Sequence, residues 1–449
     1  MMKPNMRSLL RFSFTFALLG AHFLRAQEPV ALSLGGAARM AADKNAAPEV
    51  ARMRFEQAEA RVRQRRAEFL PSVSAVAFDN ERTFNSASFG ISFVNPATGK
   101  STFDPNGEIL GPVKTWDVRG TVRQSIFDPS AFARMRAARA SVTASGADVA
   151  NAAQQAAAAA AAVYVRAQRA DAQLGARTAD STLAAELLTI ARDQLSAGVG
   201  VALDVTRAQS QLSLMRSQLI AARTERERSR LELLRAIGLP LSTPLTMTDS
   251  LSAVAVAVPS EGEAVLQAVR TRADLRALDE LATAADRQLG AIRAERLPAL
   301  SLFADQGSTG KATQHLLPTY TWGIQLSVPV FDGFRRDGRA DEQHSAMREI
   351  DVRRRDLLQQ ATAEVRAALL DVASAREQLA ASEERVGFAE QELAQARDRF
   401  RAGVSGNADV ITASMALNAA RTQMVDARSA LQAARVSIAR AQGTVIELP

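Results

Sequence analysis

The chain carries the segment AGVGVALDVTRAQSQL at residues 197–212 and repeats its framework as AGVSGNADVITASMAL at residues 402–417, an offset of 205 residues. Other landmarks recur in the same order, with Phe127-Asp128 answered by Phe331-Asp332, Leu70-Pro71 by Leu297-Pro298, and Gly238 by Gly443. A repeat of this size is far longer than a solenoid repeat. We therefore predict two similar halves, each a complete structural unit.

The sequence around the first segment predicts a long helix that is broken once. Residues 130–239 contain no proline and are rich in Ala, Leu, Gln, Glu and Arg. Gly198 at the break can adopt the left-handed conformation that ends a helix, and Asp204 can stabilise the start of the returning helix. Apolar residues on the returning helix alternate in steps of three and four, and the second copy keeps this seam through residues 410–441. This spacing predicts left-handed coiled-coil packing, which Arg226 interrupts in the first copy.

The two arms of each hairpin differ in length. Helical segments at residues 47–69 and 273–296 are expected to stack end to end on the shorter arms, so that each half becomes a long helix flanked by two short ones. The alanine run at residues 156–162 has two interpretations, close packing through small side chains or a strong helix former on an exposed face.

Strands are predicted between the helices of each half. Residues 115–126 and 320–330 alternate apolar and polar side chains, and weaker partner strands are expected at residues 73–78 and 300–304. One interpretation of such alternation is the half-buried sheet of a soluble domain. We favour a membrane barrel, because the strands are long enough to cross an outer membrane. Trp116, Tyr320 and Trp322 fall in these strands, where an aromatic girdle would place them.

Four strands are too few to close a barrel. Two chains would give eight strands and a barrel filled by its own side chains, whereas three chains would give twelve strands and room for an aqueous pore. We therefore expect a trimer.

The N-terminus and the composition narrow the class of protein. Residues 1–26 combine basic residues with an apolar run, as a secretory signal peptide does, and a retained N-terminal anchor is the alternative. Four of the 55 basic residues lie in this segment without any acidic residue, so the net charge of the rest is +3 instead of +7. An exported chain of this charge is not expected to bind nucleic acid. The chain has no cysteine, which excludes disulfides and lipoprotein processing.

These features divide the chain into a signal peptide at 1–26, a first structural repeat at 27–238, an equatorial linker at 239–260 and a second structural repeat at 261–449. Each repeat is expected to hold a helix, a strand hairpin and a long helical hairpin. The insertion at residues 85–112 makes the first strand connection longer than the second, and it is either an extracellular loop or a disordered surface insertion. No catalytic residue, metal site or cofactor is expected, because no histidine pair has ligand spacing and no nucleotide-binding motif is complete.

Together these features resemble the TolC-like outer-membrane efflux and secretion channel family. The resemblance is carried by Leu32-Ser33-Leu34, Asn45, Pro48, Leu70-Pro71, Phe127-Asp128, Ala197-Gly198, Asp204-Val205, Arg272-Ala273-Asp274-Leu275, Leu297-Pro298, Val330-Phe331-Asp332, Ala402-Gly403 and Asp409-Val410. It implies a mainly α fold with a small β part, in which tandem-duplicated helical hairpins form a coiled-coil α-barrel. Four strands per chain would join the twelve-stranded β-barrel of a homotrimer.

The resemblance further implies a channel in the cell outer membrane with a periplasmic helical tunnel. The channel would contact outer-membrane lipid and pass substrates to the exterior from a periplasmic adaptor and an inner-membrane pump, in efflux or type I secretion. The alternative from another class is a soluble periplasmic coiled-coil adaptor or scaffold. An adaptor should show one helical hairpin flanked by Gly-rich β-domain halves. The substrate does not follow from the sequence.

In this family the two interhelical turns form the periplasmic mouth. The resemblance assigns adaptor contact to Gly198, Val199, Gly200, Gly403, Val404 and Ser405, and the gate to Asp204, Asp409, Phe400, Arg399 and Arg401. Asp409 matches a lumen-facing acidic position, which gives a ring of three carboxylates by symmetry. Phe400 and Thr412 replace a tyrosine and a carboxylate of some relatives, so we expect a different closed state, with Arg399 or Arg401 as the partner of Asp204. The alternative is that both aspartates only stabilise helix N-termini.

Overall fold

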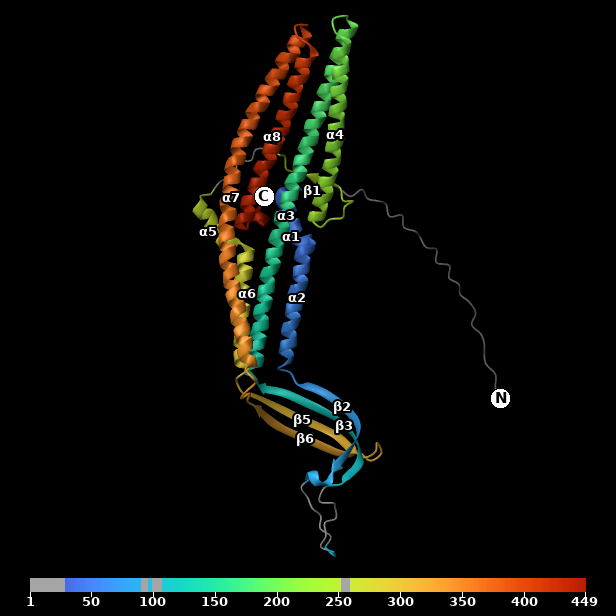
Figure 1. Ribbon diagram of the computed structural model, residues 1–449, viewed down its shortest axis with the longest axis vertical. Helices are drawn as coiled ribbons and strands as arrows, with labels where there is room; N and C mark the ends of the chain where they lie inside the picture. Colours follow the sequence, from blue (N-terminus) through green and yellow to red (C-terminus); the bar gives the residue numbers. More distant parts are fainter. Residues whose placement is uncertain (1–28, 90–95, 99–106, 252–258) are drawn as a thin grey trace, which may run out of the picture.

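The computed structural model describes residues 29–89, 96–98, 107–251 and 259–449. These residues form an elongated molecule with two helical hairpins at one end and a four-stranded sheet at the other (Figure 1). The expected signal peptide lies outside the described residues, as do parts of the insertion at 85–112 and of the linker at 239–260.

Each half contains one long helix that turns back into a shorter one. The pairs are α3 (Pro129–Ser196) with α4 (Ala202–Ala236), and α7 (Arg335–Arg401) with α8 (Asn407–Gln442). Towards the sheet, α2 (Ala46–Ala67) continues the line of α4 and α6 (Ala273–Ala294) continues that of α8 (Figure 1). The predicted long helix flanked by two short ones is thus confirmed in both halves. None of the helices in the described part of the chain is long and apolar enough to cross a membrane.

Local sequence determines where the long helices begin and end. Pro129 lies in the first turn of α3, and the carboxylate of Asp128 accepts the backbone N–H groups of Ser130 and Ala131. At the far ends, Gly198 has φ +75° and Gly403 has φ +71°, a conformation that glycine adopts without steric strain. The predicted breaks at these two glycines are confirmed.

The predicted coiled-coil seam is the buried stripe of each returning helix. In α8, Val410, Ala413 and Leu417 are at most 2% exposed, and buried seam residues recur as far as the end of the helix. In α4 the seam is buried near the turn but gives way to Arg226, whose Nε donates to Asp171 Oδ1 of α3 at 2.7 Å. An interhelical ion pair therefore replaces apolar contact at this step of the first copy.

The largest apolar core lies at the waist, where the two halves meet. Strand β1 (Val30–Leu32) and helix α1 (Leu34–Lys44) pack on the alanine-rich face of α3, beside the ends of α4 and α8 and the 3-10 turn η2 (Val445–Glu447). The alanine run has both expected surfaces, because four of its members are buried in this core while Ala159 and Ala162 are exposed. Tyr164 is fully buried and donates its hydroxyl to the Leu32 carbonyl at 2.8 Å.

Two further elements of the waist, like β1 and α1, were not predicted. Strand β4 (Leu245–Met247) lies within the expected linker and pairs in parallel with β1. Helix α5 (Glu261–Thr271) begins with a capping box formed by Ser260 and Glu263 and packs against α7.

The four long strands form one antiparallel sheet in the order β2-β3-β5-β6. Their bounds are β2 (Ser72–Asn85), β3 (Ile109–Phe127), β5 (Ala299–Gly310) and β6 (Leu317–Ser327), and the 3-10 turn η1 (Ser86–Phe89) follows β2. The two predicted hairpins therefore join through β3 and β5, with β2 and β6 at the edges. One prediction was wrong, because β6 ends at Ser327 and does not reach Val328 and Val330. Pro329 has no N–H to donate to a strand ladder, which explains this end.

Candidate functional site

The two interhelical turns lie at the same end of the molecule, far from the sheet (Figure 1). Each turn closes with backbone hydrogen bonds, in which the N–H of Val199 donates to Gln194 and that of Val404 donates to Arg399, both at 3.0 Å. The side chain of Val199 is 79% exposed and that of Val404 is 71% exposed. The turns therefore present apolar side chains to solvent from a rigid backbone. Gly198, Gly200, Gly403 and Ser405, which the sequence also assigned to this surface, lie in the same two turns.

A buried amide links the two turns within one chain. Asn407 is completely buried at the start of α8 and donates its side-chain amide to the backbone carbonyl of Asp204 at 3.0 Å. The carboxylate of Asp204 is paired with Arg207 of its own helix at 3.8 Å, and not with Arg399 or Arg401 of this chain. Sequence reasoning missed Asn407, because its counterpart in the first copy is an alanine.

The remaining residues assigned to the gate separate into buried and exposed. Phe400 is only 4% exposed and packs with Leu187, Leu393 and Val410, so its side chain belongs to the interface between the hairpins. Gln194 donates to the Phe400 backbone carbonyl at 3.1 Å. By contrast, Arg399, Arg401 and Asp409 are exposed, and Asp409 lies in the first turn of α8. The structure therefore places a phenyl ring in the packing and leaves the charges at the surface.

Further along the two hairpins, away from the turns, a buried carboxylate joins them. Asp180 of α3 is 1% exposed and lies 3.3 Å from Arg177 and 3.5 Å from Arg421 of α8. Asn418 of α8, with its amide turned to donate, lies 2.6 Å from the same carboxylate. Burial raises the pKa of Asp180, and the two arginines only partly oppose it. The polar contacts here and at Asn407 hold the two hairpins of one chain together as a unit.

The register of the sheet gives it two chemically different faces. Residues that share the face of Trp116 include Val118, Val122, Leu302, Ile324 and Leu326, and Tyr320 and Trp322 are on this face too. Tyr320 is 77% exposed and Trp322 72% exposed, which is unusual for aromatic side chains in a soluble domain. The structure thus brings the three predicted girdle residues onto one exposed apolar face.

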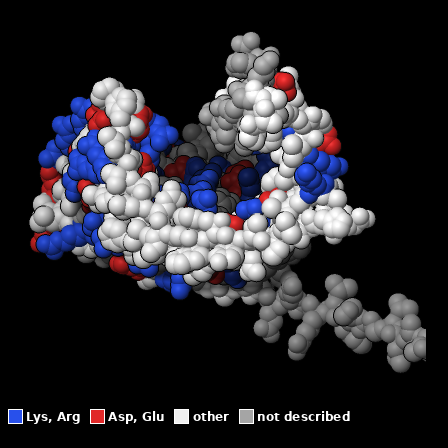
Figure 2. Space-filling model, turned by 90° about the horizontal axis from the view of Figure 1, so that it is seen from below, with Lys and Arg blue, Asp and Glu red and all other residues white. Residues whose placement is uncertain are grey.

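The opposite face of the sheet carries charge. Arg119 donates its Nε to Asp117 at 2.7 Å and its Nη1 to Asp305 of the neighbouring strand at 3.1 Å. Gly307 is the cross-strand partner of Arg119, and a Cβ at Gly307 would overlap the Arg119 side chain, so this position needs glycine. Seen from the sheet end, Lys, Arg, Asp and Glu side chains gather inside the hollow that the chain encloses, while much of the outer wall is uncharged (Figure 2).

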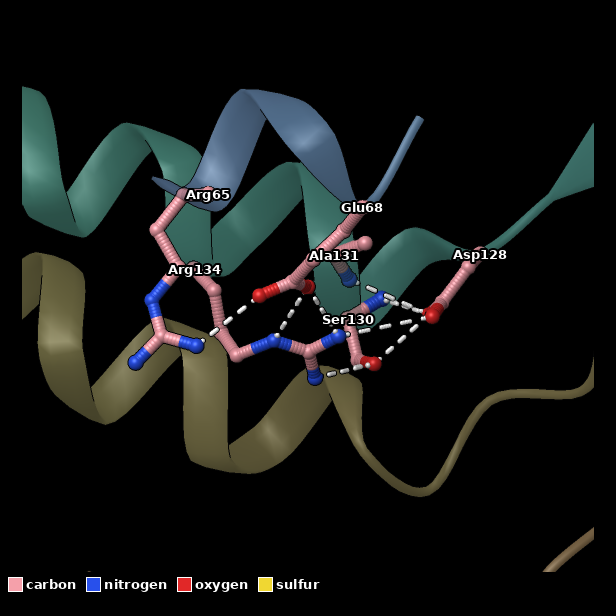
Figure 3. Close-up of polar contacts among 6 residues, drawn as sticks. All are labelled: Arg65, Glu68, Asp128, Ser130, Ala131 and Arg134. Carbon is pink, nitrogen blue, oxygen red and sulfur yellow. Dashed lines mark hydrogen bonds and ion pairs between the residues drawn. The ribbon is translucent and has the colours of Figure 1, made fainter. Parts of the chain in front are cut away.

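A polar cluster that sequence reasoning missed fastens the strands to the helices. Arg134 of α3 donates to Glu68 Oε2 at the end of α2 at 2.7 Å and also contacts Asp128, and Arg65 donates to Glu68 Oε1 at 2.8 Å (Figure 3). Burial raises the pKa of Glu68, but the hydrogen bonds and charges of Arg65 and Arg134 outweigh it and leave that pKa lowered. For Asp128 the balance is similar, and its pKa is lowered as well.

The second half repeats this cluster. Arg339, which lies 205 residues after Arg134, donates to Glu295 at the end of α6 at 2.7 Å. Asp332, the counterpart of Asp128, accepts from Arg336 at 2.7 Å. The recurrence of arginine at this offset was a signal that could have identified the cluster.

Exposed phenylalanines lie where the strands meet the long helices α3 and α7. Phe127 is 52% exposed, Phe331 is 73% exposed and Phe334 is 70% exposed. The rings of Phe331 and Phe334 pack edge to face, with their centroids 5.4 Å apart. Phe334 has a φ of 63°, which is uncommon for a residue with a bulky side chain.

In the described residues, no group of three or more His, Asp or Glu side chains is placed to hold a metal ion.

Comparison with known proteins adds to this geometry. The family model described as outer membrane efflux protein matches residues 38–239 and 265–444. The alkaline protease secretion protein AprF of Pseudomonas aeruginosa is 25% identical over 314 residues, which are 69% of this chain and 65% of that protein. The probable efflux pump outer membrane protein TtgC of Pseudomonas putida is 26% identical over 272 residues, 58% of this chain and 54% of that protein. The chain thus spans less than two thirds of these relatives.

Solved structures share the fold over nearly the whole length. The outer-membrane channel OprN superposes with a TM-score of 0.72 at 19% identity, covering 92% of this chain and 90% of that one. The CmeC outer membrane channel of Campylobacter jejuni gives a TM-score of 0.73 at 17% identity, with 92% and 85% covered.

Proposed function

Because the chain belongs to the outer membrane efflux protein family, we propose that three copies form a channel that carries substrates out through the outer membrane. A periplasmic adaptor and an inner-membrane pump would deliver these substrates to the helical tunnel. Export would use residues 1–26 as the signal peptide, and the two structural repeats, 27–238 and 261–449, would be joined at the waist by 239–260.

The observation that carries this proposal is the two-faced sheet with two edge strands. One face exposes Trp322, Ile324 and Leu326, as a lipid-facing wall would, and the other carries the Asp117, Arg119 and Asp305 cluster, as an aqueous lumen would. Strands β2 and β6 run antiparallel to each other across the sheet, so β6 of one chain can pair with β2 of the next in the same sense as the existing pairs. Three copies then supply twelve strands.

The tip supports docking of a partner. Val199, Val201, Leu203 and Val404 are all more than half exposed at the turns. Apolar side chains at the end of a helical tunnel fit an adaptor that covers them. We assign the gate to Asp409 and Asp204 near these turns, and we place Phe400 behind them as packing.

The fold does not favour the soluble adaptor. An adaptor is expected to show one helical hairpin flanked by Gly-rich β-domain halves, whereas this chain has two hairpins and two strand pairs in one sheet. One relative is named for protease secretion and another for efflux, so proteins of this fold carry different cargo. We therefore infer that the pump, and not the fold of the channel, selects the cargo.

The proposal is tested by the mass and shape of the protein extracted from membranes with detergent. Light scattering should give the mass of a trimer, and negative-stain images should show a tube at least ~100 Å long, since α3 and α7 are long helices with a rise of about 1.5 Å per residue. A monomer or dimer that leaves with the periplasmic fraction without detergent would overturn the channel and favour a scaffold.

A further inference from the structure

A pocket of about 410 Å³ lies where the helices approach the sheet, next to the polar cluster of Arg65, Glu68, Asp128 and Arg134. Its wall includes Arg61 and Arg65 of α2, Arg134 of α3, Arg339 of α7 and Glu295 of α6. Four arginines thus face one cavity that is lined by a single carboxylate. The floor is formed by small side chains, Ala58 and Ala291, which are 3% and 1% exposed and give the pocket its depth.

Side chains from α2, α3, α6 and α7 all contribute to the wall of this pocket. We infer from this shared wall that the pocket opens on the hollow side of the molecule. In the view from the sheet end, Lys and Arg side chains are prominent inside this hollow (Figure 2). Figure 3 shows Arg65 and Arg134 beside α6, which lies across the same cavity.

The arginines differ in how many donors they have left. Arg134 is the most engaged, because it makes four hydrogen bonds, two to Glu68 and one each to Asp128 and Ser130. Arg65 and Arg339 each use a single nitrogen, Nη1, for a carboxylate. Arg61 is exposed and has no hydrogen-bond or ion-pair partner among the described residues. Because a guanidinium has five N–H donors in a fixed fork, Arg61 and Arg65 of α2 and Arg339 of α7 keep free donors, so that two different helices offer donors to one cavity.

We propose that this pocket binds a multivalent oxyanion, a small molecule with at least two phosphate or carboxylate groups. Guanidinium forks match the geometry of these groups and bind them with charge-assisted hydrogen bonds. Two or more arginines on separate helices can bind two anionic groups of one ligand at once, whereas a ligand with a single anionic group can engage only one of these arginines. If the channel function holds, on which this step rests, the pocket lies on the path of cargo and gives anionic cargo a binding site before the barrel.

The test is calorimetric titration of the full-length, detergent-extracted protein with inorganic pyrophosphate and with citrate at low ionic strength. We expect saturable binding with one site per chain. Arg61→Gln should weaken it about tenfold, as the loss of one charge-assisted hydrogen bond implies. Because Arg61 has no partner in the part of the chain that the structure describes, this variant leaves the contacts of Arg65, Glu68, Asp128 and Arg134 intact.

Arg63→Gln is the matched control. Arg63 lies on the same helix, is also exposed and does not line the pocket, so the same change of charge should leave the affinity unaltered. Equal weakening by both variants would show unspecific attraction to a basic surface and would overturn the site. Absence of saturable binding to the unmodified protein would overturn it as well.

Conductance of the same preparations in planar bilayers separates this inference from the channel. A preparation that conducts but binds neither anion contradicts the pocket and supports the channel. A preparation that binds pyrophosphate but forms no pores contradicts the channel, and with it the cargo role, while the anion site itself is supported.

Discussion

Two glycines with the same backbone conformation lie in very different surroundings. Gly198 at the tip has φ +75° with open space around it, and Gly238 at the waist has φ +74°. A Cβ at Gly238 would overlap the backbone carbonyl of Lys44, where α1 ends. Gly443, its counterpart in the second half, packs closely on the backbone of Arg272. These glycines let α4 end against the junction of α1 and α2, and α8 end against the junction of α5 and α6.

We predict that Gly238→Ala destabilises the protein far more than Gly198→Ala. Both variants pay about 1–2 kcal/mol for a left-handed alanine, but only Gly238→Ala adds a clash with backbone that cannot move aside. The measurement is the denaturant midpoint of each purified variant. Equal midpoints would show that the waist tolerates the side chain and that the contact with Lys44 is loose.

Asp409 allows a test of the gate. By symmetry, three exposed carboxylates would surround the tip of a trimeric channel and attract cations. Asp409→Asn is therefore expected to lower cation selectivity in planar bilayers, and this difference should shrink at high salt. Asp43→Asn removes another exposed carboxylate, at the end of α1 far from the tip, and serves as the control. If the Asp409 variant kept its selectivity, the carboxylate ring would be refuted, and the role of Asp409 would be limited to stabilising the N-terminus of α8.

At the scale of the elements, the clusters of the two halves fix the angle between strands and helices. Glu68 and Asp128 have lowered pKa values in the folded chain, and so does Asp332 in the second half. A carboxylate with a lowered pKa contributes stability above its unfolded value of about 4, and that contribution is lost as the pH falls through the folded pKa.

We predict that the thermal midpoint falls on acidification below about pH 4 and that Glu68→Gln with Asp128→Asn flattens this dependence. The comparison between variants is needed because the raised pKa of Asp180 acts with the opposite sign. Asp180→Asn should therefore steepen the loss of stability in acid. If the double variant kept the full pH dependence, the cluster would not be the source of the acid sensitivity.

The elements also show what the sequence could and could not predict. The helix breaks at Gly198 and Gly403, the seam of α8 and the faces of the strands follow from local signals with a fixed period, so they were predictable. The pairing of Arg134 with Glu68 joins residues far apart in the chain, and the link from Asn407 to Asp204 depends on how two hairpins meet. Neither partner can be read from a local period, although the recurrence of Arg134 as Arg339 marks the position of the cluster. Phe400 was misjudged for the same reason, since its burial depends on the other hairpin.

For the whole molecule, the two edge strands decide how copies assemble. Within one chain β2 and β6 are separated by β3 and β5, a distance of about 14 Å at the usual strand spacing. A disulfide needs Cβ atoms about 4 Å apart, so cysteines on β2 and β6 cannot pair inside a chain. The protein has no cysteine of its own, which makes introduced cysteines unambiguous.

We predict that a cysteine on β2 forms disulfides only with a cysteine on β6 of another copy. Val76→Cys on the charged face should be combined in turn with cysteine at Thr319, Thr321, Gln325 or Ser327 of the same face, so that several registers between copies are sampled. In a closed three-fold barrel, at least one combination should give covalent dimers and trimers on non-reducing gels. Ala75→Cys points to the apolar face and should give none with the same partners. If every combination stayed monomeric in membranes under oxidising conditions, the edges would not meet and the barrel would need another means of closure.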